Sequence, residues 1–314
     1  MSDTLYDLII IGGGPAGVSA AVYAARKKLT SLLITPDFGG QSVVSVDIQN
    51  WIGTPHLPGP EMAKQFEAHV MEYADPALSV KKGLRAERVA RNEDDTFTVE
   101  TSQGTYSSRT VLIATGADRR KLTVPGAQEY EHKGVTYCAS CDGPMFTDQD
   151  VAVIGGGNAG FESAAQLLAY CKSVTLLEYN DAFKAEQVTV DAVLADPKMT
   201  ALTSAKITQV HGEAMVTGLS YEDLTTGEVH ELAVTGIFVE IGILPATQLV
   251  SELVELDELN RIPVDARNQR TSIAGLWAAG DCTNELYHQN NIAAGDGVKA
   301  LEDIYVHLKT RGVA

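Results

Sequence analysis

Cysteine is scarce in this sequence, and so are basic residues. Only 4 cysteines occur among 314 residues, too few for a framework of structural disulfides. Two of them, Cys138 and Cys141, form one C-x-x-C in "VTYCASCDGPM", a spacing open to half of a zinc site, a structural disulfide or a redox-active dithiol. Lys and Arg number 24 against 41 Asp and Glu, and the net charge of −17 argues against nucleic acid and anionic membrane surfaces as partners.

Long apolar segments are missing as well. No apolar run approaches the roughly 20 residues of a membrane-spanning helix. The opening "MSDTLYDLIIIGGGPAG" has no basic segment of the kind that begins a signal peptide, so we expect a cytoplasmic protein. In a reducing compartment a C-x-x-C is more often catalytic or metal-binding than structural. His69, His132, His211 and His230 are scattered without the spacing of a metal site, and we expect no metal.

The most informative pattern is an internal repeat. "LIIIGGGPAGVSAAVYAARKKLTSLLIT", from Leu8, aligns with "VAVIGGGNAGFESAAQLLAYCKSVTLLE", from Val151, at an offset of 143 residues. Each copy is typical of a strand, a G-x-G-x-x-G loop, a helix and a second strand. The glycines let the backbone approach a pyrophosphate at a helix N-terminus. The repeat therefore predicts two bound dinucleotides; the alternative is a pair of tight turns without ligands.

The segments around the repeats indicate how the domains are arranged. Short strands with turns are expected after each repeat, and the chain closes with a strand ending at Asp281 and a helix from about Asn290 to Lys309. We expect an α/β fold with two Rossmann-like domains, each a three-layer ββα sandwich. The second domain is expected to be inserted into the first. The expected domains are residues 1–118 with 247–314, and residues 119–246, with linkers near Asp118 to Lys121 and Leu244 to Thr247.

A series of short motifs resembles the low-molecular-weight thioredoxin reductase family over essentially the whole chain. The motifs are "GGGPAG" (12–17), "GGQ" (39–41), "NW" (50–51), "ATG" (114–116), "KGVTYCASCDG" (133–143), "GGGNAG" (155–160) and "AAGDC" (278–282). In this order they are highly specific. The resemblance implies that the first unit binds FAD, that the inserted unit binds a nicotinamide nucleotide, and that the C-x-x-C exchanges electrons with the flavin.

The resemblance also implies which residues contact FAD. Asp281 would hold the ribityl chain by a charge-assisted hydrogen bond, the alternative being a solvated loop acid. Gln289 would place its backbone N–H near the pyrimidine end of the flavin, although His288 stands where the family usually has arginine. The full FAD set is Gly12, Gly14, Pro15, Ala16, Gly17, Gly40, Gln41, Asn50, Thr115, Gly116, Gly280, Asp281 and Gln289.

The C-x-x-C is best interpreted as a redox-active dithiol. Zinc would need two more ligands, and the remaining cysteines, Cys171 and Cys282, are isolated and expected to be inert. By resemblance, a nicotinamide passes hydride to the flavin, and the flavin reduces the Cys138–Cys141 disulfide through Cys141. Cys138 would then attack the partner's disulfide. Asp142 is the candidate proton donor and acceptor for the thiols, unless it merely begins the "DG" turn.

The second repeat departs from the family in its adenosine-binding run. The basic residues that the family uses for NADPH are replaced in "LLEYNDAFKAEQ", and Glu178 stands 21 residues after Gly157, where an acid accepts hydrogen bonds from the ribose of NAD. We expect NADH to be preferred over NADPH, unless Glu178 merely ends a strand. The expected nucleotide-binding residues are Gly155, Gly157, Asn158, Ala159, Gly160, Glu178, Tyr179 and Lys184.

The sequence thus predicts an FAD-containing, NADH-preferring disulfide reductase of a thioredoxin- or glutaredoxin-like protein. The "EYNDAFKAEQ" run also resembles the flavoprotein component of alkyl hydroperoxide reductase, whose N-terminal thioredoxin-like region accepts the electrons. This chain begins only a few residues before its first strand, so we expect a separate protein as the electron acceptor.

The family resemblance implies a homodimer. Two alternatives stay open: ferredoxin or reduced flavin as the electron donor, and a non-catalytic flavin- and nucleotide-binding redox sensor.

Overall fold

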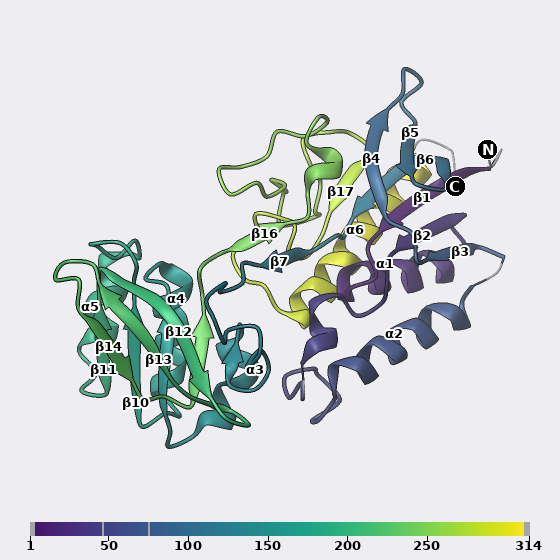
Figure 1. Cartoon of the computed structure of the whole chain (residues 1–314). Helices are drawn as coiled ribbons and strands as arrows, with labels where there is room; N and C mark the ends of the chain where they lie inside the picture. The colour runs from purple at the N-terminus through teal and green to yellow at the C-terminus, as the bar shows by residue number, and fades with distance from the viewer. Residues whose placement is uncertain (1–3, 46, 75, 311–314) are drawn as a thin grey trace. The chain divides into compact units, whose positions relative to one another are not determined.

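The computed structural model describes residues 4–45, 47–74 and 76–310, which form two compact units (Figure 1). The first unit comprises the chain up to Asp118 and from Leu244 onward, and the second comprises Arg119–Ile243. The chain returns to the first unit at Leu244. It passes between the units in two short strands, β7 and β16, which pair with each other in a two-stranded sheet.

The first unit is built on a seven-stranded sheet in the order β3-β2-β1-β6-β5-β4, with β17 also paired to β6. Its strands and those of the connection are β1 (Leu5–Ile11), β2 (Ser31–Thr35), β3 (Leu78–Lys82), β4 (Ala86–Arg91), β5 (Phe97–Thr101), β6 (Gly104–Ile113), β7 (Ala117–Arg119), β16 (Ile243–Pro245) and β17 (Leu276–Ala278). Its helices are α1 (Pro15–Arg26), α2 (Gly59–Glu72) and α6 (Asn290–Thr310), with short 3-10 turns η1 (Gly40–Val44) and η3 (Gln248–Val250).

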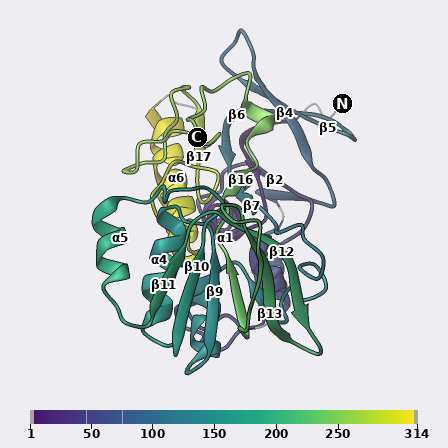
Figure 2. The same cartoon turned by 60° about the vertical axis from the view of Figure 1, so that its left-hand side comes forward.

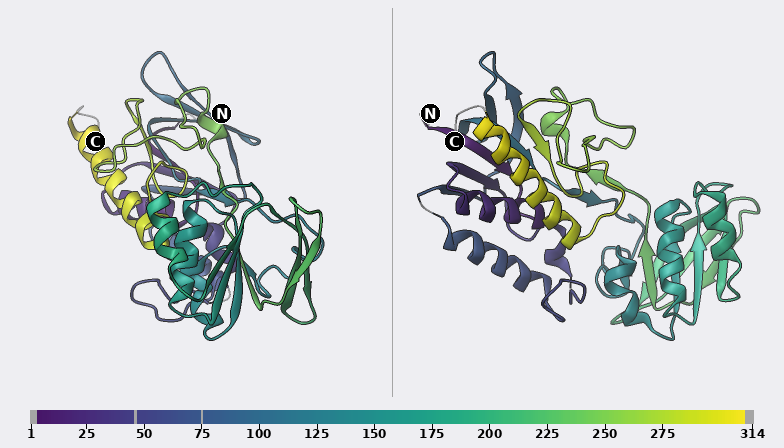
Figure 3. Two further views of the ribbon diagram at one scale, coloured as in Figure 1. Left: turned by 90° about the vertical axis from the view of Figure 1, so that its left-hand side faces the viewer. Right: turned by 180° about the vertical axis from the view of Figure 1, so that it is seen from behind.

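The sheet of the first unit is covered on both faces. Alternate residues of β1 face opposite sides: Leu8 and Ile10 pack against α1, α2 and α6, whereas Ile9 and Ile11 pack against residues of β4, β5 and the segment 249–262. The helices α1 and α6 run side by side (Figure 3). Their contact is close at Gly297, where an added Cβ would lie 2.1 Å from the carbonyl oxygen of Ala16.

The second unit repeats this plan with a five-stranded sheet in the order β11-β10-β9-β15-β8. Figure 2 shows α4 and α5 on one face of this sheet and the antiparallel strands β12 and β13 on the other. The strands are β8 (Val135–Thr136), β9 (Asp150–Ile154), β10 (Ser173–Leu177), β11 (Met199–Leu202), β12 (Ala205–Gly212), β13 (Val216–Asp223), β14 (Val229–Leu232) and β15 (Gly236–Val239). The helices are α3 (Ala139–Asp142), α4 (Asn158–Leu168) and α5 (Gln187–Leu194), with the 3-10 turn η2 (Gly143–Phe146).

The predicted fold class, two Rossmann-like α/β units, is confirmed, and so is the final helix. The prediction that the last strand ends at Asp281 is wrong, because β17 covers only Leu276–Ala278. A turn closed by the N–H of Leu276 on the carbonyl of Ile273, with Gly275 at φ +91°, occupies the residues before it. Asp281 lies beyond the strand, in a turn that begins at Gly280 with φ +76°.

Two kinds of feature are absent from the described residues. None of their helices combines the length and the apolar character needed to cross a membrane. No group of three or more His, Cys, Asp or Glu side chains in this part of the chain is arranged to hold a metal ion.

Candidate functional site

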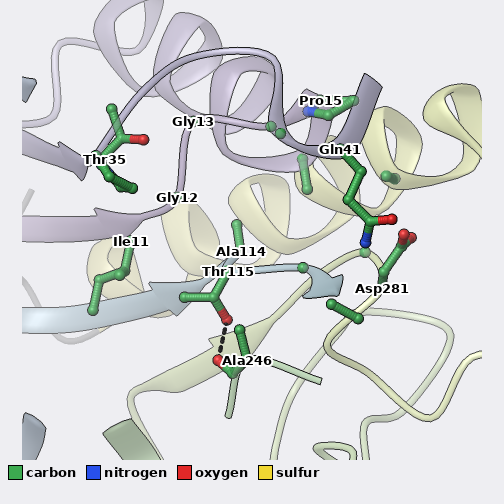
Figure 4. Close-up of a pocket in the computed structure, with 18 of the residues that line it drawn as sticks. Ile11, Gly12, Gly13, Pro15, Thr35, Gln41, Ala114, Thr115, Ala246 and Asp281 are labelled. Carbon is green, nitrogen blue, oxygen red and sulfur yellow. Dashed lines mark hydrogen bonds between the residues drawn. The ribbon is translucent and has the colours of Figure 1, made fainter. Parts of the chain in front are cut away.

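A cavity of about 550 Å³ lies in the first unit, where the carboxyl ends of β1 and β6 meet the N-terminus of α1 (Figure 4). The chain reverses its direction of strand addition between these two strands, and such a crevice is where open α/β sheets bind ligands. Ten of the residues predicted to contact FAD line this cavity: Gly12, Gly14, Pro15, Ala16, Gly40, Gln41, Thr115, Gly116, Gly280 and Asp281.

The three glycines of the first loop have different structural roles. Gly12 has φ +124°, and an added Cβ would lie 2.1 Å from the carbonyl oxygen of Ala114. A Cβ on Gly17 would lie 1.9 Å from the carbonyl oxygen of Gly12, so both positions need glycine for backbone packing. A Cβ on Gly14 would meet no atom within 4 Å. The backbone at Gly14, which precedes α1, therefore has free space beside it, as a pyrophosphate at a helix N-terminus requires.

The polar side chains of the cavity come from segments far apart in the sequence. In Figure 4 the amide of Gln41 and the carboxylate of Asp281 point toward each other across the cavity. The Thr115 hydroxyl donates a hydrogen bond of 2.7 Å to the carbonyl of Ala246, which joins the "ATG" segment to the returning chain. A carboxylate, an amide and a free helix N-terminus together suit the hydroxyl groups and the diphosphate of a dinucleotide.

Three predicted FAD residues do not line the cavity. Gly17 is buried under the loop. Asn50 donates through Nδ2 to Oε1 of Gln289 at 3.2 Å, so these two side chains bind each other.

The cavity also includes Asp37, Arg85 and Gln248, which the sequence motifs did not single out. They lie outside the sequence motifs, and only the folded chain brings them to the loop.

The second glycine loop has the same construction as the first. Gly155 has φ +115°, and an added Cβ would lie 2.3 Å from the carbonyl oxygen of Glu240. A Cβ on Gly160 would lie 1.9 Å from the carbonyl oxygen of Gly155, whereas one on Gly157 would meet nothing within 4 Å. Asn158 and Ala159 are exposed in the first turn of α4. The backbone at the start of α4 is thus also open to a phosphate group.

Glu178 is fixed in place at the end of β10. Its side chain is buried, and its Oε2 accepts the N–H of Gly156 at 2.6 Å. Its Oε1 accepts the backbone N–H of Asn180 at 2.8 Å and also the side-chain amide of Asn180. Three donors therefore hold the carboxylate against the glycine loop, in line with an acid that meets a ribose diol. Asn180 was not among the predicted residues.

Tyr179 and Lys184 border the same loop in different ways. The Tyr179 side chain is 60% exposed, so its ring is available to a ligand. The backbone N–H of Lys184 donates to the carbonyl of Gly156 at 2.9 Å, and its side chain is exposed.

The C-x-x-C lies at the start of α3 in the second unit, and Cys138 and Cys141 form a disulfide. The Cys138 sulfur is at the N-cap and accepts the backbone N–H of Cys141 at 3.1 Å. A hydrogen bond of this kind favours a thiolate over a thiol when the pair is reduced. Cys171 and Cys282 are buried, and burial raises the pKa of each thiol to about 11, so both are protonated near neutral pH.

Asp142 follows Cys141 and is linked to the strand before the disulfide. The hydroxyl of Thr136, on β8, donates to Oδ2 of Asp142. Burial raises the pKa of Asp142, and the hydrogen bond from Thr136 and the nearby His132 oppose part of that rise. The carboxyl group therefore keeps its proton to a higher pH than an exposed aspartate does, as a proton donor to a thiolate must.

The sequence was compared with models of known protein families, and the matching family agrees with the two glycine loops and the Cys138–Cys141 disulfide. The model described as pyridine nucleotide-disulphide oxidoreductase matches residues 6–297. The chain belongs to this family.

Members of known structure share the fold. The thioredoxin reductase of Streptococcus pyogenes MGAS5005 is 35% identical, with a TM-score of 0.89 over 98% of this chain and 100% of that chain. The thioredoxin reductase of Giardia duodenalis is 29% identical, with a TM-score of 0.91 over 98% of this chain and 100% of that one. The predicted resemblance to thioredoxin reductases is thus confirmed at the level of fold and family.

Two curated relatives are longer proteins. An NADH dehydrogenase of Bacillus subtilis is 39% identical over 304 residues, which are 96% of this chain and 58% of that protein. One component of the alkyl hydroperoxide reductase of Pseudomonas putida is 41% identical over 305 residues, again 96% of this chain and 58% of the relative. The chain therefore spans about three fifths of the length of these relatives.

Proposed function

We propose that this protein is a flavin-dependent disulfide reductase that takes electrons from NADH and delivers them through Cys138 and Cys141 to a thioredoxin- or glutaredoxin-like protein. The single observation that carries the proposal is the Cys138–Cys141 disulfide, formed in the same unit as the second glycine loop of a pyridine nucleotide-disulphide oxidoreductase. Its position at the N-cap of α3 supports a redox role rather than a structural one.

The cavity of the first unit supports FAD as the bound group. The open backbone at Gly14 would accept the pyrophosphate, and Asp281 with Gln41 would bind the hydroxyl-bearing part of the molecule. When bound, FAD supplies a two-electron carrier between a nicotinamide nucleotide and a dithiol. Asn50 and Gln289, which do not line the cavity, are still proposed to contact the flavin part of FAD.

The dithiol would act by thiol–disulfide exchange. The Cys138 thiolate attacks one sulfur of the partner's disulfide, and the second sulfur of that disulfide leaves as a thiolate. Cys141 then attacks the Cys138 sulfur in the mixed disulfide, which restores the Cys138–Cys141 bond and releases the partner with two thiols. Asp142, which holds a proton to raised pH, would protonate the leaving thiolate.

The donor is proposed to be NADH because of the charges around the second loop. The Glu178 carboxylate is directed to the loop and would accept hydrogen bonds from a ribose diol, but it would repel a 2′-phosphate. The acceptor is proposed to be a separate protein, and the enzyme is proposed to act as a cytoplasmic homodimer.

An anaerobic titration tests the donor. The purified protein is titrated with NADH and, separately, with NADPH, and bleaching of the long-wavelength flavin band is followed. We expect NADH to bleach the flavin at a concentration at least about tenfold lower than NADPH, because one charge repulsion is worth about that factor. Bleaching by dithionite but by neither nucleotide would show that the donor is a different molecule.

A cysteine variant tests the route to the partner. The Cys138→Ser/Cys141→Ser variant should still be bleached by NADH, but it should reduce no thioredoxin in an assay that counts the thiols released. Full retention of thioredoxin reduction in this variant would exclude the dithiol as the carrier and overturn the proposed function.

A further inference from the structure

A carboxylate borders the second glycine loop at a position where the first loop has a methyl group. Strand β15 ends beside β9, and the N–H of Glu240 donates to the carbonyl of Ile154 at 2.8 Å. In the first unit β6 ends beside β1, and the N–H of Ala114 makes the same bond to Ile11, also at 2.8 Å. Ala114 and Glu240 are therefore equivalent, and each carbonyl lies against the first glycine of its loop.

The Glu240 side chain is buried and has two partners. Its exposed fraction is 6%, its Oε1 accepts the hydroxyl of Ser163 at 2.8 Å, and its Oε2 pairs with Nη1 of Arg119 at 3.2 Å. Burial raises the pKa of Glu240, Glu162 raises it further, and Arg119 and Ser163 lower it. Arg119 is the one cation that forms an ion pair with Glu240 in the part of the chain that the structure describes.

The place of this pair matters for a phosphate-bearing ligand. The edge between β9 and β15 is the point where the strand order of the second sheet reverses, which is where such sheets bind ligands. A dinucleotide brings two negative charges in its pyrophosphate. Because Glu178 also lies against this loop, at Gly156, an uncompensated Glu240 would oppose those charges strongly, since water screens a buried charge poorly.

We propose that Arg119 is a positioning residue of the nicotinamide-nucleotide site, which neutralises Glu240 so that the second glycine loop can accept a pyrophosphate. This inference rests on the proposed function, since it takes the second loop to bind the nucleotide. Arg119 acts through Glu240, and its guanidinium group need not touch the ligand.

The test is a double-mutant cycle with Arg119→Gln and Glu240→Gln, which change the charges and keep the side chains long. Binding of NADH and NAD⁺ to the FAD-loaded protein is measured by isothermal titration calorimetry. We expect R119Q to weaken binding by about tenfold or more. E240Q alone should bind at least as tightly as the wild type, and R119Q/E240Q should return to within about threefold of it.

The pH dependence separates this role from a purely structural one. Arg119 from β7 and Glu162 and Ser163 from α4 are the groups that act on Glu240. Without Arg119, Glu240 takes up a proton at a higher pH, so the defect of R119Q should shrink as the pH falls from 8.5 to 6. A defect that is independent of pH would overturn the inference. Lys121→Ala removes a neighbouring positive charge that pairs with Glu131 and should leave binding unchanged.

The remaining outcomes are also decisive. If the wild type binds NADH and R119Q binds it equally well, the inference is wrong and the proposed function stands. If the double variant stays as weak as R119Q, or if E240Q alone loses affinity, Arg119 does not act through Glu240. If the wild type binds neither nucleotide, the proposed donor and this inference fail together.

Discussion

The glycine loops of the first and the second unit make equivalent backbone hydrogen bonds. Gly12 N donates to Ile34 O and Gly155 N donates to Leu177 O, both at 2.9 Å. In both units the strand pairings keep the same register at an offset of 143 residues. The backbone geometry is therefore equally suited to a pyrophosphate in both loops and gives no basis for distinguishing one dinucleotide from another.

The two loops differ in the side chains at the ends of the neighbouring strands. Thr35 at the end of β2 is replaced by Glu178 at the end of β10, and the Thr35 hydroxyl is occupied with the carbonyl of Asp37. Ala114 at the end of β6 is replaced by Glu240 at the end of β15. At these two strand ends the first loop thus has neutral residues, Thr35 and Ala114, and the second has two carboxylates. We therefore expect these strand-end residues, rather than the glycine motif, to determine which dinucleotide each loop binds.

The largest expected effect comes from a Cβ at the first glycine of either loop. Gly12→Ala and Gly155→Ala each force a residue with a side chain to adopt positive φ, and each places its Cβ against a backbone carbonyl. Each should lower the free energy of unfolding of its unit by about 3 kcal/mol or more. We expect G12A to be purified without FAD, whereas G155A keeps FAD but is not bleached by NADH. Flavin absorbance per protein and anaerobic titration measure the two losses.

Matched controls come from the third residue of each loop. Gly14→Ala and Gly157→Ala add a Cβ that meets no protein atom within 4 Å, so both variants should melt within a few degrees of the wild type. Any loss in these variants is then a loss of ligand binding. If G155A lost FAD as completely as G12A, the assignment of one dinucleotide to each loop would be wrong.

A smaller effect is expected from the acid at the end of β10. Glu178→Gln keeps the shape and removes the charge that is proposed to select against a 2′-phosphate. The ratio of kcat/KM for NADH to that for NADPH should fall by about tenfold. Thr35→Ser, at the equivalent position of the first loop, should leave this ratio unchanged. An unchanged ratio in E178Q would place the selectivity elsewhere.

The sequence was sufficient to predict what depends on local spacing. The glycine positions of both loops, the two Rossmann-like units and the final helix all follow from patterns within a few tens of residues. The length of β17 was not predictable in this way, because the turn at Gly275 interrupts an otherwise strand-like apolar run. The run in "TSIAGLWAAGD" gave no sign that only its centre would pair with β6.

The residues that the sequence did not reveal depend on contacts between distant segments. Glu240 reaches the second loop only because β15 pairs with β9 after the excursion through β12, β13 and β14, and the repeat itself ends at Glu178. Arg119 meets Glu240 from the connection between the units, and Thr136 meets Asp142 from β8. Neither partner has a motif, so only the register of the folded sheet identifies them.

The smallest expected effect on nucleotide binding comes from Asn180, which follows β10, in comparison with Asp37, which follows β2. Asn180 is equivalent to Asp37, but its amide and its backbone N–H both bind the Glu178 carboxylate, whereas Asp37 accepts the N–H of Phe38. Asn180→Ala removes one of three donors to Glu178 and leaves the backbone bonds, so we expect KM for NADH to rise about threefold with kcat unchanged. Asp37→Ala should leave KM for NADH unchanged. A rise of KM in D37A equal to that in N180A would mean that the two loops are not specialised, and the comparison between them would then hold for the backbone only.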